Sequence, residues 1–380
     1  MAVAAVLLKR EEARPTDPAV SHRSRRSRTR RSFAALLSGL AAFVAFQLGL
    51  AAVVEIGMPE VRDPLYGRRL HLVQKRLRAE PAKPWTVMML GSSRTEHAFR
   101  VRKDEEKAWA EILGHPVATF NFGVPGAGSL TELLTWGRLR RDGVRPSLLL
   151  IEVLPAYLAA PPSDYNEVFL PTDRLAWRDL PLIERYVGTI RTGLRRDWLE
   201  SWPMAGYTHR LSLIKLVGPE LLPPGYRLAG AAGLDESGAP PTADAPVTSE
   251  QRQRAIQFAG IEYHPRFAGF QLGGPQCQAL CELLASCRKE GVSVAMVVMP
   301  EGPTFRSWYP PGTWEDIKAW LTQVGREYNA PLVNAREWLD DENDFRDSHH
   351  LLLSGRDKFK ERLGRETILP LLRRPSLSSP

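Results

Sequence analysis

Two short segments, far apart in the chain, carry side chains that could act together as a nucleophile and its base. The first is Gly91-Ser92-Ser93, and the second contains Asp347 and His350 near the C-terminus. An aspartate three residues before a histidine can orient the imidazole, which leaves the other ring nitrogen free to accept the proton of a serine hydroxyl. Either segment alone also has a simpler interpretation, as a helix cap or a surface pair. Their chemistry therefore depends on whether the fold brings them together.

The elements around these segments predict where the chain places them. Five short apolar runs have the length and composition of buried parallel strands, and they alternate with stretches of helical spacing. This alternation predicts an α/β fold with a doubly wound, flavodoxin-like parallel sheet of about five strands. The strands are expected at Thr86–Leu90, Val117–Phe122, Ser147–Val153, Val292–Met299 and Pro331–Asn334, and the main helices at Ser129–Arg141, Gln276–Glu290, Trp314–Tyr328 and from Ser354 onward.

The two serines directly follow the first of these strands. Ligands of open α/β sheets bind at the carboxyl ends of the strands, so this position suits a catalytic group. The second strand ends in a loop from Asn121 to Ser129 that contains three glycines and a proline. Such a loop lets the backbone approach a substrate closely. A plain flexible connection between strand and helix is the alternative interpretation.

Taken together, the serine after the first strand, the glycine loop after the second and the Asp-x-x-His segment before the last helix resemble the SGNH (GDSL-like) hydrolase superfamily. The resemblance covers roughly residues 86–368, with a long insertion in the middle. It implies that Ser93 is the nucleophile, that His350 is its base and that Asp347 orients His350. It also implies that the backbone N–H groups of Ser93 and Gly126 form an oxyanion hole.

Two positions depart from the usual pattern of this family. Ser92 stands where the family has an aspartate, and Gly-Ser-Ser is similar to the membrane-anchored branch that modifies cell-envelope polymers, such as the alginate O-acetylation proteins. The family's third block supplies an asparagine to the oxyanion hole, but residues 151–157 contain none, and Asn166 lies further along the chain. The loss of one such donor can lower the rate by about 10²–10³.

The resemblance implies an ester hydrolase or an O-acyltransferase that acts on an acylated carbohydrate or envelope polymer. In the membrane-anchored branch, such a protein works beside a multi-spanning acyl-exporting partner. The alternative is a non-catalytic envelope protein that keeps the fold and binds a glycan.

Neighbouring side chains offer alternatives for single roles. Ser92 could replace Ser93, and His349 could replace His350, but the family pattern and the Asp-x-x-His spacing favour Ser93 and His350. Arg94 could bind an acidic group of the substrate, or it could be a salt-bridged structural residue. No cofactor and no metal ion are expected, because the acids before the motif lie in a loop where such side chains are usually solvated: Asp340, Asp341, Glu342 and Asp344.

The N-terminal part differs from the rest in charge and hydropathy. Residues 1–32 hold nine Lys/Arg and three acids, whereas the whole chain has a net charge of +8. The folded body is therefore almost neutral, and nucleic-acid binding is not expected. The 22 residues Phe33–Val54 carry no charge and are long enough to cross a hydrocarbon layer of about 30 Å.

These features predict the order of the domains. We expect a basic cytoplasmic tail at 1–32, a transmembrane signal anchor at 33–57, a connector at 58–84 and a catalytic domain at 85–375 with a mainly helical insertion at about 158–270. The basic tail should be disordered. The positive-inside rule keeps the tail in the cytoplasm and places the catalytic domain of this single-pass protein of the cytoplasmic membrane in the periplasm or outside the cell.

Two further composition features concern the body of the chain. The tract Gly225–Val247 is rich in Gly, Ala and Pro and is expected to form a flexible loop. The three cysteines match no zinc or redox spacing and are expected to be small buried side chains: Cys277, Cys281 and Cys287.

Overall fold

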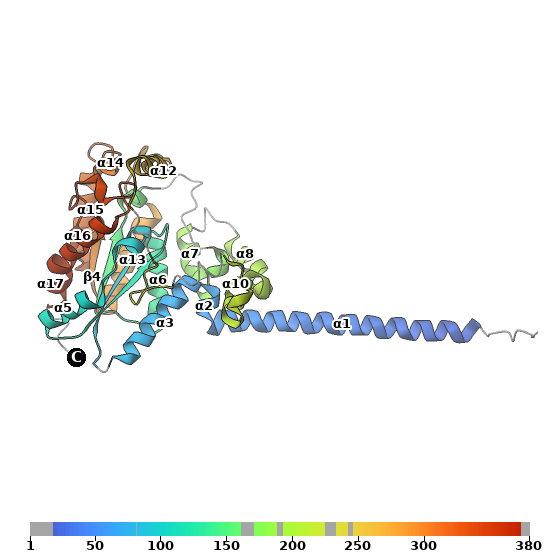
Figure 1. Cartoon of the computed structure of the whole chain (residues 1–380). Helices are drawn as coiled ribbons and strands as arrows, with labels where there is room; N and C mark the ends of the chain where they lie inside the picture. The colour runs from blue at the N-terminus through green and yellow to red at the C-terminus, as the bar shows by residue number, and fades with distance from the viewer. Residues whose placement is uncertain are drawn as a thin grey trace, which may run out of the picture.

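The computed structural model describes residues 18–80, 82–160, 171–187, 193–224, 233–241 and 246–373, and Figure 1 shows their arrangement. At the centre is one sheet of five parallel strands in the order β2-β1-β3-β4-β5. This is the flavodoxin-like order of a doubly wound sheet, so the predicted fold class is confirmed. The strands are β1 (Trp85–Gly91), β2 (Val117–Gly123), β3 (Leu148–Val153), β4 (Ser293–Val298) and β5 (Leu332–Asn334).

Helices cover both faces of the sheet, because successive strand residues point to opposite sides. On β1, Met88 and Leu90 face one core, whereas Val87 and Met89 face the other, and all four are fully buried. The first core lies under α3 (Pro64–Ala79), α6 (Ser129–Arg141), α13 (Gly274–Lys289) and α15 (Thr313–Tyr328), and the second under α5 (Lys103–Leu113), α16 (Leu353–Leu363) and α17 (Leu369–Leu372).

The insertion between β3 and β4 is mainly helical in its described residues, as predicted. Residues 225–232 and 242–245 of the expected flexible loop lie outside the described residues. The part between them is docked on the body, since the carbonyl of Ser237 accepts from Asn121 N at 2.6 Å and that of Gly238 accepts from Arg69 at 2.9 Å. The helices of the insertion are α7 (Leu180–Val187), α8 (Leu194–Ser201), α9 (Ala205–Thr208), α10 (Arg210–Val217) and α12 (Ser249–Phe267).

One long helix, α1 (Pro18–Gly57), projects from the body. The prediction of a disordered basic tail is wrong for residues 18–32, because these residues continue the apolar helix without a break; extending a helix costs far less than starting one. Residues 1–17 lie outside the described residues. Within the described chain, Arg30–Gly57 is the one segment that is long and apolar enough to cross a membrane, judged by length and composition alone.

The segment expected as a connector forms α2 (Pro59–Arg62) and α3. Tyr66, Leu70 and Val73 of α3 are part of the first core, so this segment packs against the sheet. In α13, Cys277 and Cys287 are buried and Cys281 is partly buried, and all three are free thiols, as the sequence predicts.

Candidate active site

The turn between β1 and α4 (Ser93–Ala98) places both serines at the carboxyl end of the sheet. Ser92 caps the helix, because its Oγ accepts a hydrogen bond from a backbone N–H of the first turn at 3.1 Å. Ser93 is the first residue of α4 and is half-buried. Gly91 is needed before them, because a Cβ there would collide with Thr95 Oγ1 and with the Glu152 carboxylate.

Ser93, His350 and Asp347 come together at this end of the sheet. Oγ of Ser93 lies 2.7 Å from Nε2 of His350, and Nδ1 of His350 lies 2.7 Å from Oδ2 of Asp347. With the ring proton on Nδ1, the imidazole donates to Asp347, and its Nε2 accepts from the Ser93 hydroxyl. This is the arrangement of a serine nucleophile, its base and the acid that orients the base.

A tight turn fixes the position of His350 relative to Asp347. Oδ1 of Asp347 accepts a hydrogen bond from the backbone N–H of His350 at 2.8 Å. Between them, Ser348 has a left-handed backbone with φ 69°, which non-glycine residues adopt only when their surroundings hold them there. Here the hydroxyl of Ser348 accepts from Phe305 N at 2.9 Å, and its carbonyl accepts from Gly302 N at 2.7 Å.

The carboxyl of Asp347 is kept ionised by its histidine neighbour. Burial alone would raise the pKa of Asp347, but the electrostatic attraction of His350 and the hydrogen bond from its ring N–H outweigh burial and hold the pKa well below its usual range. An ionised carboxylate stabilises the imidazolium that forms when His350 takes up a proton.

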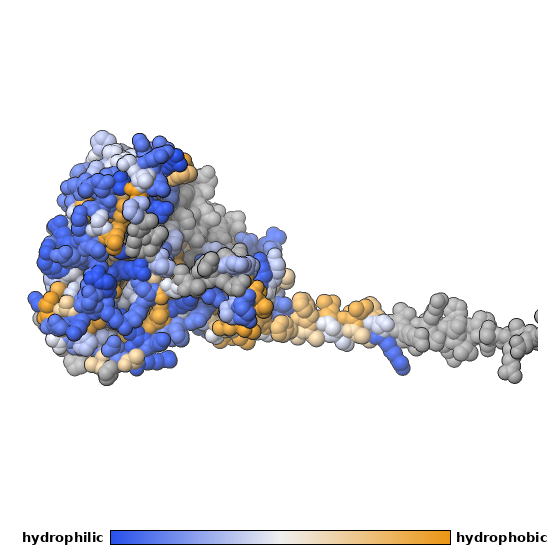
Figure 2. Space-filling model, in the orientation of Figure 1, coloured by the Kyte–Doolittle hydropathy of each residue, from blue (hydrophilic) through white to orange (hydrophobic). Residues whose placement is uncertain are grey.

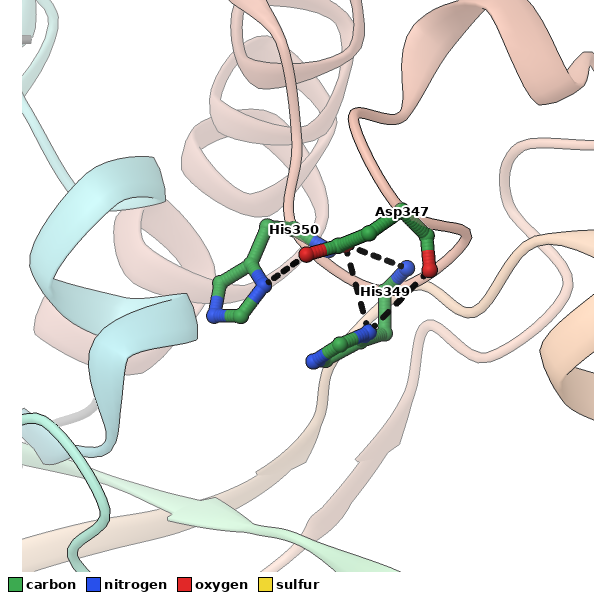
Figure 3. Close-up of side chains that lie close together, drawn as sticks. All are labelled: Asp347, His349 and His350. Carbon is green, nitrogen blue, oxygen red and sulfur yellow. Dashed lines mark hydrogen bonds and ion pairs between the residues drawn. The ribbon is translucent and has the colours of Figure 1, made fainter. Parts of the chain in front are cut away.

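His349 lies beside this group in another environment. Figure 3 shows the His350 ring directed toward α4, and its centroid lies 4.1 Å from that of the His349 ring. The His349 side chain is 4% exposed, and its ring stacks on Phe305 with 5.1 Å between centroids. Burial, followed by the charge of His350, lowers the pKa of His349 to about 3. The possible ligand atoms of Asp347, His349 and His350 lie within 4.8 Å of one another, so this cluster is also where the described residues could hold a metal ion.

The oxyanion donors expected from the sequence are the backbone N–H groups of Ser93 and Gly126. Within the described residues, no hydrogen bond takes up the N–H of Ser93 or of Gly126. The loop that carries Gly126 is tied to the end of β1, because Val124 N donates to Gly91 O at 2.8 Å. Gly126 has φ 72°, a conformation that favours glycine. Asn166, the remaining candidate for a third donor, lies outside the described residues.

Comparisons with known proteins do not assign this chain to a family. No family model matches the chain, and no curated protein matches it. Among solved structures, it is similar to a mutant of Axe2, an acetyl-xylooligosaccharide esterase from Geobacillus, with 12% identity and a TM-score of 0.33, over 78% of this chain and 97% of that chain. A likeness at this level supports no conclusion about activity.

Glu152, at the end of β3, is a site residue that the sequence analysis missed. Its side chain is buried, and Oε2 accepts from Ser92 N at 2.8 Å, from Thr95 N at 3.2 Å and from Thr95 Oγ1 at 2.6 Å. Oε1 accepts from Ser92 Oγ at 2.8 Å. One carboxylate on a neighbouring strand thus fixes the turn that presents Ser93. The signal was a charged residue inside an apolar strand that must be buried on both faces.

Arg94 does not lie where a substrate would contact it. Its side chain is 1% exposed, and Nη2 donates to Pro300 O at 3.0 Å. Its guanidinium lies 3.8 Å from the Glu152 carboxylate and 3.7 Å from that of Glu301. The expected contact with an acidic substrate group is therefore corrected: burial behind the serine turn makes Arg94 the salt-bridged residue of the two alternatives.

Proposed function

We propose that this chain is a membrane-anchored serine enzyme that transfers acyl groups from an ester, to water as a hydrolase or to a hydroxyl group as an O-acyltransferase. The observation that carries this proposal is the continuous hydrogen-bonded chain from Ser93 through His350 to Asp347. Its position supports the proposal as well. The site lies at the carboxyl ends of the neighbouring strands β1 and β3, whose following connections lead to opposite edges of the sheet. Ligands of doubly wound folds usually bind at such a point.

In this proposal, each step of acyl transfer has a group of this site to carry it. Nε2 of His350 takes the proton of Ser93 as Oγ attacks the ester carbonyl, and the carbonyl oxygen becomes an oxyanion facing the N–H groups of Ser93 and Gly126. The imidazolium then gives this proton to the departing alkoxide, which leaves as an alcohol, and an acyl-serine remains. In the second half, water or a sugar hydroxyl loses its proton to His350 and takes the acyl group, after which the proton returns to Ser93.

The cellular setting of the proposal comes from α1. Its apolar part anchors the body in the cytoplasmic membrane, and the basic residues before it favour a cytoplasmic N-terminus. The body then works in the periplasm or outside the cell, where acylated carbohydrates and envelope polymers are the available esters. A multi-spanning partner that exports acyl groups would supply an acyl donor for transfer.

Labelling with a fluorophosphonate tests the nucleophile. The full-length wild-type chain in detergent should react, because such probes trap a serine activated by a neighbouring base, and Ser93→Ala should not. Ser307→Ala is the matched control, since Ser307 is exposed and, among the described residues, bonds only within its own turn. It should label like the wild type. Equal labelling of wild type and Ser93→Ala would contradict the nucleophile assignment. No labelling of the folded wild type would favour the non-catalytic, glycan-binding alternative.

A panel of p-nitrophenyl acyl esters then separates hydrolysis from transfer. A hydrolase releases nitrophenol at a rate that an added polysaccharide leaves unchanged. An O-acyltransferase releases it faster with the right acceptor, and the acyl group appears on the polysaccharide.

A further inference from the structure

At the edge of the insertion beside α1, several large apolar side chains are exposed, because no described residue covers them. They lie on the stretch that contains α9, α10 and the short turn Pro219–Leu221, and their exposed fractions range from 37% to 85%. Water-facing surfaces rarely gather so many large apolar side chains unless a partner or a membrane covers them. This apolar edge consists of Met204, Tyr207, Leu211, Leu216, Val217 and Leu221.

The apolar edge adjoins α1 inside the uncharged stretch of that helix. The N–H of Gly206 donates to Oε1 of Gln47 at 3.2 Å, and a Cβ on Gly206 would press on the same amide group. Further along α1, Ala51 and Val54 are also covered, with 1% and 3% exposure. The polar Gln47 in an otherwise apolar helix therefore faces the insertion. Small residues at such contacts are typical of helices that pack together within membranes.

The depth of this contact follows from helix geometry. A helix rises 1.5 Å per residue, so Gln47 lies about 10 Å before Val54, the last residue of the uncharged stretch. With this stretch in the hydrocarbon, Gly206 and its neighbours lie at the level of the outer leaflet. Figure 1 shows α8 and α10 standing beside the C-terminal part of α1. In Figure 2 apolar side chains run along α1 and on to the adjoining edge of the body.

Residues suited to the membrane–water boundary flank the apolar edge. Trp177 is 43% exposed and lies against the end of α1, where its backbone N–H donates to Glu55 Oε1 at 2.8 Å. Arg210 lies over the ring of Tyr207 at 4.3 Å, and Lys215 is exposed on α10. Aromatic rings are enriched at the level of the lipid headgroups, and long basic side chains keep their charge in water while their stems cover apolar surface.

We propose that the apolar edge of the insertion is embedded in the outer leaflet of the lipid bilayer, next to α1. This inference rests on the proposed membrane span of α1 and is independent of the chemistry at Ser93. A second attachment beside the anchor prevents the body from swivelling about α1 and holds the catalytic site in one orientation above the membrane.

Depth-dependent fluorescence quenching tests the inference on the full-length chain in nanodiscs of phosphatidylcholine and phosphatidylglycerol. The background carries Cys281→Ser, because the other two native cysteines are buried. A single cysteine at Val217 is labelled with an NBD fluorophore, and the lipids carry a doxyl quencher on the acyl chain. We expect Val217→Cys to give blue-shifted emission and quenching several-fold stronger than the control position described next.

Two further positions make the outcomes distinguishable. Ile112→Cys is the matched control, because Ile112 is 51% exposed on α5, at the end of the body opposite to α1, and its label should stay water-like and unquenched. Leu40→Cys, 59% exposed in the middle of the apolar stretch, reports whether α1 itself is inserted. Quenching at Leu40 with a water-like label at Val217 overturns the inference, leaves the anchor standing and points to a protein partner for this edge. A label that stays unquenched at both positions overturns the anchor and the inference together.

Discussion

Two further histidines lie beside the proposed base, His350, and the surroundings of the three separate their roles. His350 is bonded to both Ser93 and Asp347. His97, one turn after Ser93 on α4, presents its ring to that of His350 edge-on at 6.0 Å. Burial, followed by electrostatic repulsion from His350, lowers the pKa of His97 to about 4 and that of His349 to about 3. Both stay neutral near pH 7, so neither adds a competing positive charge beside His350.

The depressed pKa of His349 predicts a loss of stability in acid. Below its ordinary pKa of about 6.5 the unfolded chain takes up a proton there, whereas the folded chain does not until the pH reaches about 3. Stability from this residue is therefore complete above pH 6.5 and falls as the pH drops, by about 3 kcal/mol between pH 6.5 and 4. His349→Gln removes the titrating group, so its melting temperature should fall less steeply over this range. An unchanged slope would contradict the assignment.

At the scale of the elements, Glu152 joins β3 to the turn between β1 and α4. All four of its hydrogen bonds are accepted, two from Ser92 and two from Thr95. In Glu152→Gln one oxygen becomes an NH₂ group, which cannot accept the Ser92 hydroxyl proton, so this hydroxyl must reverse its bond and the turn is held less firmly. A misplacement of about 1 Å can lower the rate by about 10². We expect kcat and the rate of fluorophosphonate labelling to fall by about that factor, with a smaller change in KM.

Glu106→Gln is the matched control for this variant. Glu106 on α5 is also buried, also accepts from the N–H and Oγ1 of a threonine, Thr119, and pairs with Arg76. It lies away from Ser93, so its loss should lower the melting temperature and leave the labelling rate of the folded chain unchanged. If both variants lose labelling in proportion to stability, Glu152 supports only the fold.

Local sequence patterns could predict most of the elements and the residues of the triad, but little of what holds them together. β1, β2 and α6 follow from apolar runs and helical spacing, and Asp347 and His350 follow from the Asp-x-x-His spacing, whereas the choice of Ser93 over Ser92 depends on the family resemblance. The contact of Glu152 with the serine turn exists because β3 lies next to β1 in the sheet. The residues of one strand do not reveal which strand lies beside it. The burial of Arg94 has the same origin, because Pro300 and Glu301 follow β4.

At the scale of the whole molecule, one buried arginine connects three parts of the chain. Arg138 on α6 donates to Asp63, just before α3, at 2.8 Å and to Asp179 of the insertion at 2.7 Å. All three side chains are at most 5% exposed. Burial would raise the pKa of Asp179, but Arg138 outweighs it and lowers that pKa. Helix α6, the segment that follows α1 and the insertion therefore share one charge network.

Loss of this arginine should loosen both attached segments at once. Arg138→Met leaves the buried Asp63 without its ion pair and leaves Asp179 with Arg141 alone, and breaking a buried pair from one side lowers stability by about 3–5 kcal/mol. Arg195→Ala removes an exposed pair with Glu184 and should change stability by less than about 1 kcal/mol. Adding Asp63→Asn and Asp179→Asn to Arg138→Met should recover part of the loss, because the unpaired charges are then gone. Thermal unfolding and limited proteolysis of the insertion measure both effects; equal stability of Arg138→Met and Arg195→Ala would show that the network does not hold the three parts together.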